Sequence, residues 1–183
     1  ARPNPAHYAL AELQRSGKSP GVITQNIDGL HQDAGSGTVI ELHGTAREVM
    51  CIGIAPRHGT PDGCGWRSTH EWAMGRVAAG DAAPRCPHCG GLVKSATISF
   101  GQVLQPEVVE AALALAASAD LLIAAGSSLQ VQPAASLPLQ ALEGGAALVI
   151  INDEPTPLDR FADLVVREFL TYFGLKSLDE LPP

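Results

Sequence analysis

The feature that most constrains the fold is an apolar run, residues 121–125, which is followed by Gly126 and a helical stretch over about 134–143. A second apolar run, 147–151, comes after that stretch. Short runs that are apolar throughout are typical of strands buried on both faces, and such strands alternate with helices in parallel sheets. We therefore expect an α/β fold in which helices cover both faces of a parallel sheet.

Capping residues and further apolar runs place the other elements. Asn4 and Pro5 are typical of a helix start, and the Ala- and Leu-rich segment behind them ends at Gly17, a residue common just past a helix end. Further runs predict three strands and a helix: 22–24, 39–42, 93–99 and the stretch after Pro106. These elements extend the alternation of strands and helices over most of the chain.

The middle of the chain, residues 50–91, has a different composition. It holds all four cysteines, several glycines and prolines, and no sustained periodicity apart from a helical stretch near 69–79. We predict that this segment is a small module inserted into a larger domain, which residues 1–49 and 92–183 would form together.

The four cysteines of this module have the features of a structural zinc site. Cys86 and Cys89 are separated by Pro and His and followed by two glycines, a tight knuckle that points two thiolates at one ion. With Cys51 and Cys64 they would complete a closed tetrahedral Zn²⁺ site that folds a module poor in apolar residues. Buried or redox-active cysteines are the alternative, slightly favoured by the twelve residues between Cys51 and Cys64. Two histidines could replace a thiolate: His58 and His88.

The loop behind strand 22–24 reads TQNIDGLHQDAG and is dense in polar groups. Asn, Asp and Gly tolerate left-handed backbone and bond their own main chain, so a turn explains this composition by itself. A ligand-binding loop is the alternative, in which Gln25, Asn26 and Asp28 would make the contacts and His31 would shape the loop.

His43 lies at the end of strand 39–42, in IELHGT, where Gly44 leaves space beside it. An ordinary imidazole, with a pKa of about 6.5, suits a general base near neutral pH. A histidine at a strand end is more often structural, so this residue alone does not identify a site.

The turn after strand 121–125 consists of Gly126, Ser127 and Ser128. Backbone N–H groups and two hydroxyls at this place can meet ribose or phosphate oxygens at the carboxyl edge of a parallel sheet. A plain strand-to-helix turn accounts for the residues equally well. The fingerprint G-x-G-x-x-G is absent, because Gly35-Ser36-Gly37 lacks the third glycine and precedes a strand.

Charge and hydropathy exclude some classes of protein. The net charge of −7 argues against binding to nucleic acid, since such proteins carry a basic surplus on one face. The longest apolar stretch, 111–125, is interrupted by Ser118 and Asp120 and falls short of the roughly 20 residues that span a membrane. We expect neither nucleic acid nor a membrane as a partner. In the absence of a basic and then apolar leader, we expect a cytoplasmic protein.

Taken together, these motifs resemble the sirtuins, the NAD-dependent protein-lysine deacylases. The similarity covers almost the whole chain and runs in order through PNPAHYALAEL, TQNIDGLHQDAG, VIELHG, the four cysteines, ISFGQ, GSSLQVQPAA and IINDEPTP. It implies a Rossmann-like sheet with an inserted zinc module, and NAD and an acylated lysine of a protein substrate as ligands. It also implies that the acyl group is transferred to ADP-ribose and that nicotinamide is released.

The resemblance also assigns roles to single residues. Gln25, Asn26 and Asp28 match the stretch that holds the nicotinamide and its ribose, and His43 matches the catalytic base. Three further residues match the Gly-Thr-Ser turn on the ribose, with Ser in place of Thr: Gly126, Ser127 and Ser128. Asn152 matches a position on the adenosine side. The residues that match the peptide-pairing Phe-Gly-Glu stretch, with Gln in place of Glu, are Phe100, Gly101 and Gln102.

One departure from the family concerns the N-terminus. The Gly-Ala-Gly-Ile-Ser turn and the Gly-Ile-Pro-Asp-Phe-Arg loop of sirtuins, which cradle the cofactor, have no counterpart in this sequence. Because the chain starts with Ala1 instead of Met, we expect these segments to precede it. Two alternatives stay open: a catalytically impaired relative that binds zinc and peptide, and an ADP-ribosyl transferase that uses the same cleft.

Overall fold

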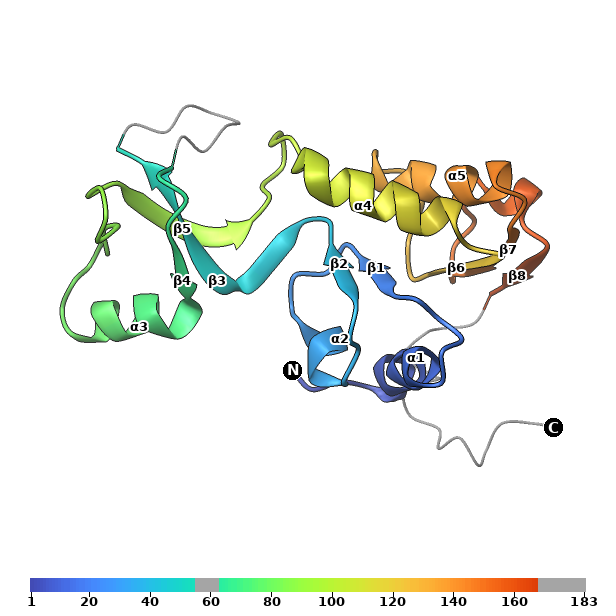
Figure 1. Cartoon of the computed structure of the whole chain (residues 1–183), viewed down its shortest axis with the longest axis horizontal. Helices are drawn as coiled ribbons and strands as arrows, with labels where there is room; N and C mark the ends of the chain where they lie inside the picture. The colour runs from blue at the N-terminus through green and yellow to red at the C-terminus, as the bar shows by residue number, and fades with distance from the viewer. Residues whose placement is uncertain (55–62, 168–183) are drawn as a thin grey trace. The chain divides into compact units, whose positions relative to one another are not determined.

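The structure is a computed structural model that describes residues 1–54 and 63–167, and its contacts divide the chain into two compact units (Figure 1). The parallel-sheet unit consists of Ala1–Ile23, Leu30–Ile40 and Pro106–Pro183. The cysteine unit consists of Thr24–Gly29 and Glu41–Gln105. The chain passes between the units at the ends of β1 (Val22–Thr24) and β2 (Val39–Glu41), which pair as a two-stranded sheet.

The first helix, α1 (Pro5–Arg15), confirms the predicted start and end. The Asn4 side chain accepts a hydrogen bond from the His7 backbone N–H at 3.2 Å, and the His7 ring accepts one from the Asn4 backbone N–H in return. This reciprocal capping satisfies two N–H groups that a helix start leaves without partners. Among the described residues, no helix combines the length and the apolar character that crossing a membrane requires.

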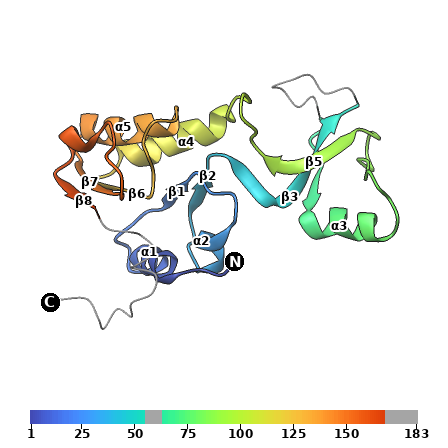
Figure 2. The same cartoon turned by 180° about the vertical axis from the view of Figure 1, so that it is seen from behind.

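The centre of the parallel-sheet unit is a three-stranded sheet in the order β6-β7-β8. The strands are β6 (Leu121–Ala125), β7 (Ala147–Ile151) and β8 (Leu164–Val166), all parallel. Two helices lie along one face, α4 (Pro106–Ala117) and α5 (Leu137–Glu143), as Figures 1 and 2 show. The remaining elements are short: α2 (Leu30–Asp33) and the 3₁₀ turns η1 (Ala134–Ser136) and η2 (Asp159–Phe161).

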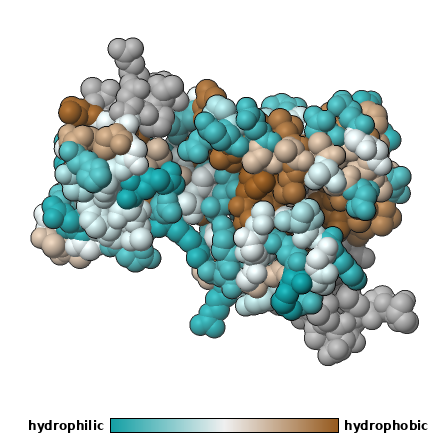
Figure 3. Space-filling view, in the orientation of Figure 1, coloured by the Kyte–Doolittle hydropathy of each residue, from teal (hydrophilic) through white to brown (hydrophobic). Residues whose placement is uncertain are grey.

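The two faces of this sheet differ in burial. On the helix-covered face, Leu148 and Ile150 of β7 are fully buried and pack with Leu129 and Leu158. The opposite face is less covered in the described part of the chain, because three of its large side chains are about half exposed. These are Leu121 (48%), Ile123 (45%) and Leu164 (54%). Figure 3 shows apolar surface over the parallel-sheet unit.

The cysteine unit is built on an antiparallel sheet in the order β4-β3-β5. Its elements are β3 (Gly44–Gly53), β4 (Arg67–Thr69), α3 (His70–Ala78) and β5 (Leu92–Thr97). The predicted strand 93–99 therefore does not continue the parallel alternation, since β5 pairs antiparallel with β3. The physical reason is that β5 pairs along one edge of β3, a ten-residue strand that the sequence pattern did not indicate.

Candidate functional site

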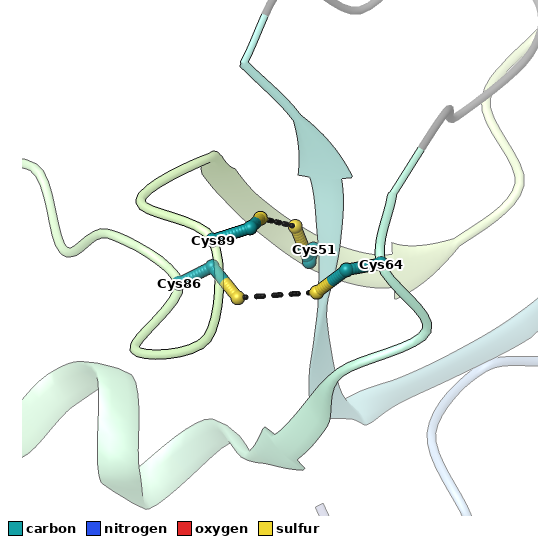
Figure 4. A group of neighbouring side chains, drawn as sticks. All are labelled: Cys51, Cys64, Cys86 and Cys89. Atoms are coloured by element: carbon teal, nitrogen blue, oxygen red, sulfur yellow. Dashed lines mark hydrogen bonds between the residues drawn. The ribbon is translucent and has the colours of Figure 1, made fainter.

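The four cysteines converge on one point of the cysteine unit (Figure 4). Cys51 lies on β3, Cys64 precedes β4, and Cys86 and Cys89 form a knuckle before β5. The knuckle is held by two backbone hydrogen bonds, from Gly90 N–H to the Cys86 carbonyl (2.8 Å) and from Cys86 N–H to the Gly91 carbonyl (2.9 Å). Three separate segments of the unit thus present their thiols to a common centre.

The geometry of the thiols fits a tetrahedral ion. The Sγ atoms of Cys51 and Cys89 are 3.5 Å apart, as are those of Cys64 and Cys86, and all four lie within 4.8 Å of one another. A zinc ion with Zn–S bonds of about 2.3 Å requires S···S edges of about 3.8 Å. All four cysteines are free thiols, so none is used in a disulfide. These donors suit Zn²⁺, and a site filled by four protein ligands is structural.

His88, one of the two histidines considered as replacement ligands, does not enter this group. Among the described residues, the ligand cluster consists of the four cysteines alone. The His88 ring packs toward Trp66, with ring centroids 6.4 Å apart. His58 lies outside the described residues.

The thiols influence each other's protonation. Backbone N–H groups of Cys64 and Gly53 lower the pKa of Cys51 to about 6, against the opposing effect of its burial. The Gly91 backbone hydrogen bond lowers the pKa of Cys89, but hydrogen bonds from the other three thiols outweigh it and raise that pKa to about 12. The cluster therefore loses its first proton easily and resists losing further ones. A divalent cation would neutralise the negative charge of the thiolates.

His43 lies in the turn between β2 and β3, beside the polar loop that begins at the end of β1. Its Nδ1 lies 3.0 Å from the carbonyl oxygen of Gln25. Because a carbonyl only accepts, Nδ1 carries a hydrogen, and this is the tautomer whose lone pair lies on Nε2 when the ring carries a single proton. The His43 carbonyl in turn accepts from Ile98 N–H at 2.8 Å, which fixes the backbone of this residue to β5.

Gly44, next to His43, is required by close backbone packing. Its φ is +72°, and a Cβ at this position would lie 2.1 Å from the carbonyl oxygen of Ala96. Any other residue would push β3 away from β5 and move the histidine. The space that the sequence indicated is therefore taken by backbone of the neighbouring strand.

The polar loop turns its main chain toward β3 and its side chains outward. The Ile27 carbonyl accepts from Ala46 N–H at 2.8 Å, and Asn26 N–H donates to the Thr24 hydroxyl at 3.0 Å. The side chains of Asn26 and Asp28 are exposed. The structure thus brings Gln25, Asn26 and Asp28 together with His43 in one unit.

The predicted residues of the parallel-sheet unit meet at the carboxyl edge of β6 and β7. Ala125 and Ile151 are paired, so Gly126 and Asn152 follow neighbouring strand ends, and Gly126 N–H donates to the Ile151 carbonyl at 2.9 Å. The hydroxyl of Ser127 accepts from Leu129 N–H at 3.3 Å and shapes the turn, whereas Ser128 is exposed. Carboxyl edges of parallel strands are where α/β proteins bind ligands.

The stretch predicted to pair with a peptide follows β5. Phe100 is fully exposed, Gly101 occupies the turn, and the Gln102 side chain accepts a hydrogen bond from Ser99 N–H at 2.7 Å. The turn lies in the cysteine unit, as does His43.

Comparison with known proteins decides the family. Residues 1–133 match the sequence model of the Sir2 family. The chain belongs to the Sir2 family. It is 46% identical over 170 residues to NAD-dependent protein deacetylase 2 of Streptomyces coelicolor, covering 92% of this chain and 66% of that protein. It is 49% identical over 169 residues to NAD-dependent protein deacetylase 1 of Bradyrhizobium diazoefficiens, covering 91% and 62%.

Solved structures of Sir2 proteins have the same fold. One described as "Sir2-p53 peptide-NAD+" matches with a TM-score of 0.82 and 40% identity, over 95% of this chain and 68% of that one. Another, "Sir2 bound to acetylated peptide", matches with a TM-score of 0.83 and 39% identity over the same shares. The chain spans slightly less than two thirds of the length of the two deacetylases above.

Proposed function

We propose that this Sir2-family chain carries the catalytic base and the peptide-binding part of an NAD-dependent protein-lysine deacylase. The observation that carries the proposal is the hydrogen bond between His43 Nδ1 and the Gln25 carbonyl, because it joins the imidazole, with Nε2 as its basic atom, to the loop that bears Asn26 and Asp28. Relatives that are 42–49% identical and named NAD-dependent protein deacetylases support the same activity.

In this proposal, His43 takes a proton from a ribose hydroxyl through Nε2. The amide and carboxylate side chains of Gln25, Asn26 and Asp28 bind the nicotinamide end of the cofactor, where they match a carboxamide and ribose hydroxyls. NAD would supply the glycosidic bond that breaks to release nicotinamide; the acyl group would leave the lysine nitrogen for ADP-ribose, and one water molecule would balance the release of free lysine. The backbone hydrogen bonds of the loop hold these groups in place before the cofactor arrives, which is how positioning lowers a barrier.

The remaining predicted contacts belong to the turn after β6, to Asn152 and to the stretch after β5. Gly126, Ser127, Ser128 and Asn152 would bind the remaining ribose and the adenosine side of NAD at the sheet edge. The stretch from Phe100 to Gln102 would pair with the substrate backbone by β-augmentation, in which main-chain bonds give affinity and side-chain pockets give specificity.

The zinc site has a structural part in this proposal. Cys51, Cys64, Cys86 and Cys89 would hold Zn²⁺ and thereby keep β3, which follows His43, against β4 and β5. Four reduced thiols suit a reducing compartment, and we propose the cytoplasm.

The test is incubation of the protein that carries this sequence with NAD and an acetyl-lysine peptide. We expect release of nicotinamide, a deacetylated peptide and O-acetyl-ADP-ribose by mass spectrometry. The variant His43→Ala should lose about 100- to 10,000-fold in rate, because it lacks the base, and should keep its zinc and its melting temperature. An ADP-ribosylated protein product would establish a transferase instead. Zinc retention without any nicotinamide release would establish a binding protein.

A further inference from the structure

Arg47 occupies an unexpected place beside the polar loop. It lies on β3, four residues beyond His43, and its guanidinium Nε donates to the carbonyl oxygen of Asp28 at 3.0 Å. No role for this arginine is predicted from the sequence, because it belongs to none of the polar motifs. The contact exists only because β3 runs back alongside the loop.

Gly29 is shaped to accept this arginine. It is buried, its φ is +72°, and a Cβ on it would lie 2.0 Å from Arg47 Nε and 2.6 Å from Arg47 Cζ. Left-handed backbone favours glycine, and the guanidinium fills the space that a side chain would need. The glycine and the arginine therefore form one contact, in which each depends on the other.

The Arg47 contact adds to two other contacts between the loop and the segment that starts at His43. The Gln25 carbonyl meets His43 Nδ1, the Ile27 carbonyl meets Ala46 N–H, and the Asp28 carbonyl meets Arg47 Nε. The first two hold the start and the middle of the loop. The third holds its end, at the residue whose carboxylate is proposed to contact NAD.

A carboxylate on α3 feels the charge of the guanidinium. The pKa of Glu71, in the first turn of α3, is lowered first by its own backbone N–H and the Thr69 hydroxyl, and also by the positive charges of His70 and Arg47. Arg47 thus lies within electrostatic range of the start of α3 as well as in contact with the loop.

We propose that Arg47 is a positioning residue, which fixes the Asp28 carbonyl and so orients the Asn26–Asp28 loop relative to His43 before NAD binds. This role rests on the proposed function. A guanidinium contact at an exposed place has a moderate effect, so the arginine tunes cofactor use without being needed for the fold.

The experiment compares Arg47→Ala with the matched variant Arg67→Ala. Arg67 is also an exposed arginine of this antiparallel sheet, but it pairs with Glu48, at 2.8 Å, and not with the loop. We expect Arg47→Ala to raise the KM for NAD roughly tenfold, with a smaller change in kcat and in the KM for peptide. Amide hydrogen exchange in residues 24–29 should become faster. Arg67→Ala should match the parent in both measurements.

Gly29→Ala provides a second arm, because its Cβ would displace the guanidinium. The double variant Gly29→Ala/Arg47→Ala should be no worse in KM for NAD than Gly29→Ala alone, since both changes remove the same contact. Additive losses would overturn the shared contact. Lysine at position 47 keeps the charge but not the planar Nε, so Arg47→Lys should restore only part of the parent's KM.

Three results separate this inference from the proposed function. A parent that releases nicotinamide, with Arg47→Ala indistinguishable from Arg67→Ala, would overturn the role of Arg47 alone. Faster exchange in Arg47→Ala with an unchanged KM for NAD would make the residue merely structural and also overturn it. A parent that releases no nicotinamide would overturn the proposed function. Amide hydrogen exchange in residues 24–29 would then test the loop contact without an activity measurement. Faster exchange in Arg47→Ala than in the parent would support the contact, and equal exchange would overturn it.

Discussion

Different interactions stabilise the interior of the parallel-sheet unit and the interior of the cysteine unit. In the first, Leu148 and Ile150 are fully buried among aliphatic neighbours, and α4 and α5 add buried alanines. In the second, the buried apolar side chains of the described residues are few: Leu42, Val49, Cys51, Cys86 and Ala96. Two of those five belong to the thiol cluster, so removing the ion would leave very little core.

This difference follows from what each sequence can bury. A small unit with so few buried apolar side chains seldom forms a sufficient core, and metal ligation then supplies the missing free energy. The parallel sheet, by contrast, buries uninterrupted apolar strands under helices and needs no ligand bonds. The comparison predicts that the two units respond to different perturbations.

Removing the metal should have the largest effect on stability, and this effect should be confined to the cysteine unit. Structural zinc contributes apparent folding free energies of about 10–16 kcal/mol in small zinc modules. We expect Cys86→Ser, or a strong chelator, to unfold the cysteine unit and leave the helical signal of the parallel-sheet unit largely unchanged. Trp66 and Trp72, the only tryptophans, both lie in the cysteine unit with ring centroids 4.7 Å apart. Their fluorescence therefore reports on this unit selectively.

His88→Ala is the control for this prediction, because His88 lies in the same knuckle without belonging to the ligand cluster. It should retain one zinc per chain and the parent's tryptophan emission. An unchanged metal content in Cys86→Ser would contradict the tetrad. Simultaneous loss of the tryptophan and far-ultraviolet signals would show that the two units unfold together.

Substitutions in the parallel sheet should have the next largest effect and should spare the zinc. Ile150→Ala removes a fully buried side chain and should lower the free energy of unfolding by about 2–5 kcal/mol. Ile123→Ala is its matched control on the neighbouring strand, where the side chain is 45% exposed, and should cost much less. Chemical denaturation followed by circular dichroism measures both.

Equal costs for the two isoleucines would break the contrast between the faces of the sheet. Ile123 would then be as well covered in solution as Ile150, and the open face would have a partner in the folded protein. A loss of zinc in Ile150→Ala would show instead that the core of one unit supports the ligand geometry of the other.

The comparison also explains which parts of the fold the sequence predicts. The strands β6 and β7 coincide with the predicted runs 121–125 and 147–151, because each run is apolar throughout and ends before a glycine or a polar residue. Helix α1 agrees with its prediction because Asn4 and Pro5 determine its start locally. Elements with such local signals need no knowledge of their neighbours.

The elements that were missed are those defined by distant partners. The strand β3 contains Thr45, Arg47 and Glu48 and has no clean alternation, yet it pairs with β4 and β5 on its two edges. The strand β8 has three residues and exists through its pairing with β7. Strand pairing is long-range, so a short or irregular strand gives little signal in a single sequence.

The candidate site divides in the same way. The thiol cluster could be predicted, because ligand type and the Cys-Pro-His-Cys spacing are local. The tautomer of His43 and the contact of Arg47 could not, because both depend on which carbonyls of the loop face β3. Sequence motifs name the chemical groups of a site, whereas tertiary packing decides their orientation.

The smallest expected effect is a pH-dependent change in stability. It should arise from a polar network around Asp159 in the parallel-sheet unit. Partial burial would raise the pKa of the Asp159 carboxyl, but hydrogen bonds from the Thr156 hydroxyl (2.7 Å) and N–H (3.0 Å) and from Arg167 outweigh burial and hold that pKa below its usual range. A lowered pKa in the folded state stabilises the protein above the ordinary carboxyl pKa, about 3.9. The contribution is lost as the pH falls through the lowered value.

We therefore expect the stability difference between the parent and Asp159→Asn to be largest near neutral pH and to shrink as the pH falls below about 4. Thr156→Val, which removes one donor and keeps the side-chain shape, should give a smaller difference with the same sign. The measurement is urea unfolding followed by far-ultraviolet circular dichroism, because tryptophan emission would report the protonation of the thiolates in the other unit. A difference that stays constant down to pH 2 would show that Asp159 acts through packing, and the parallel-sheet unit would then owe its stability to its aliphatic core alone.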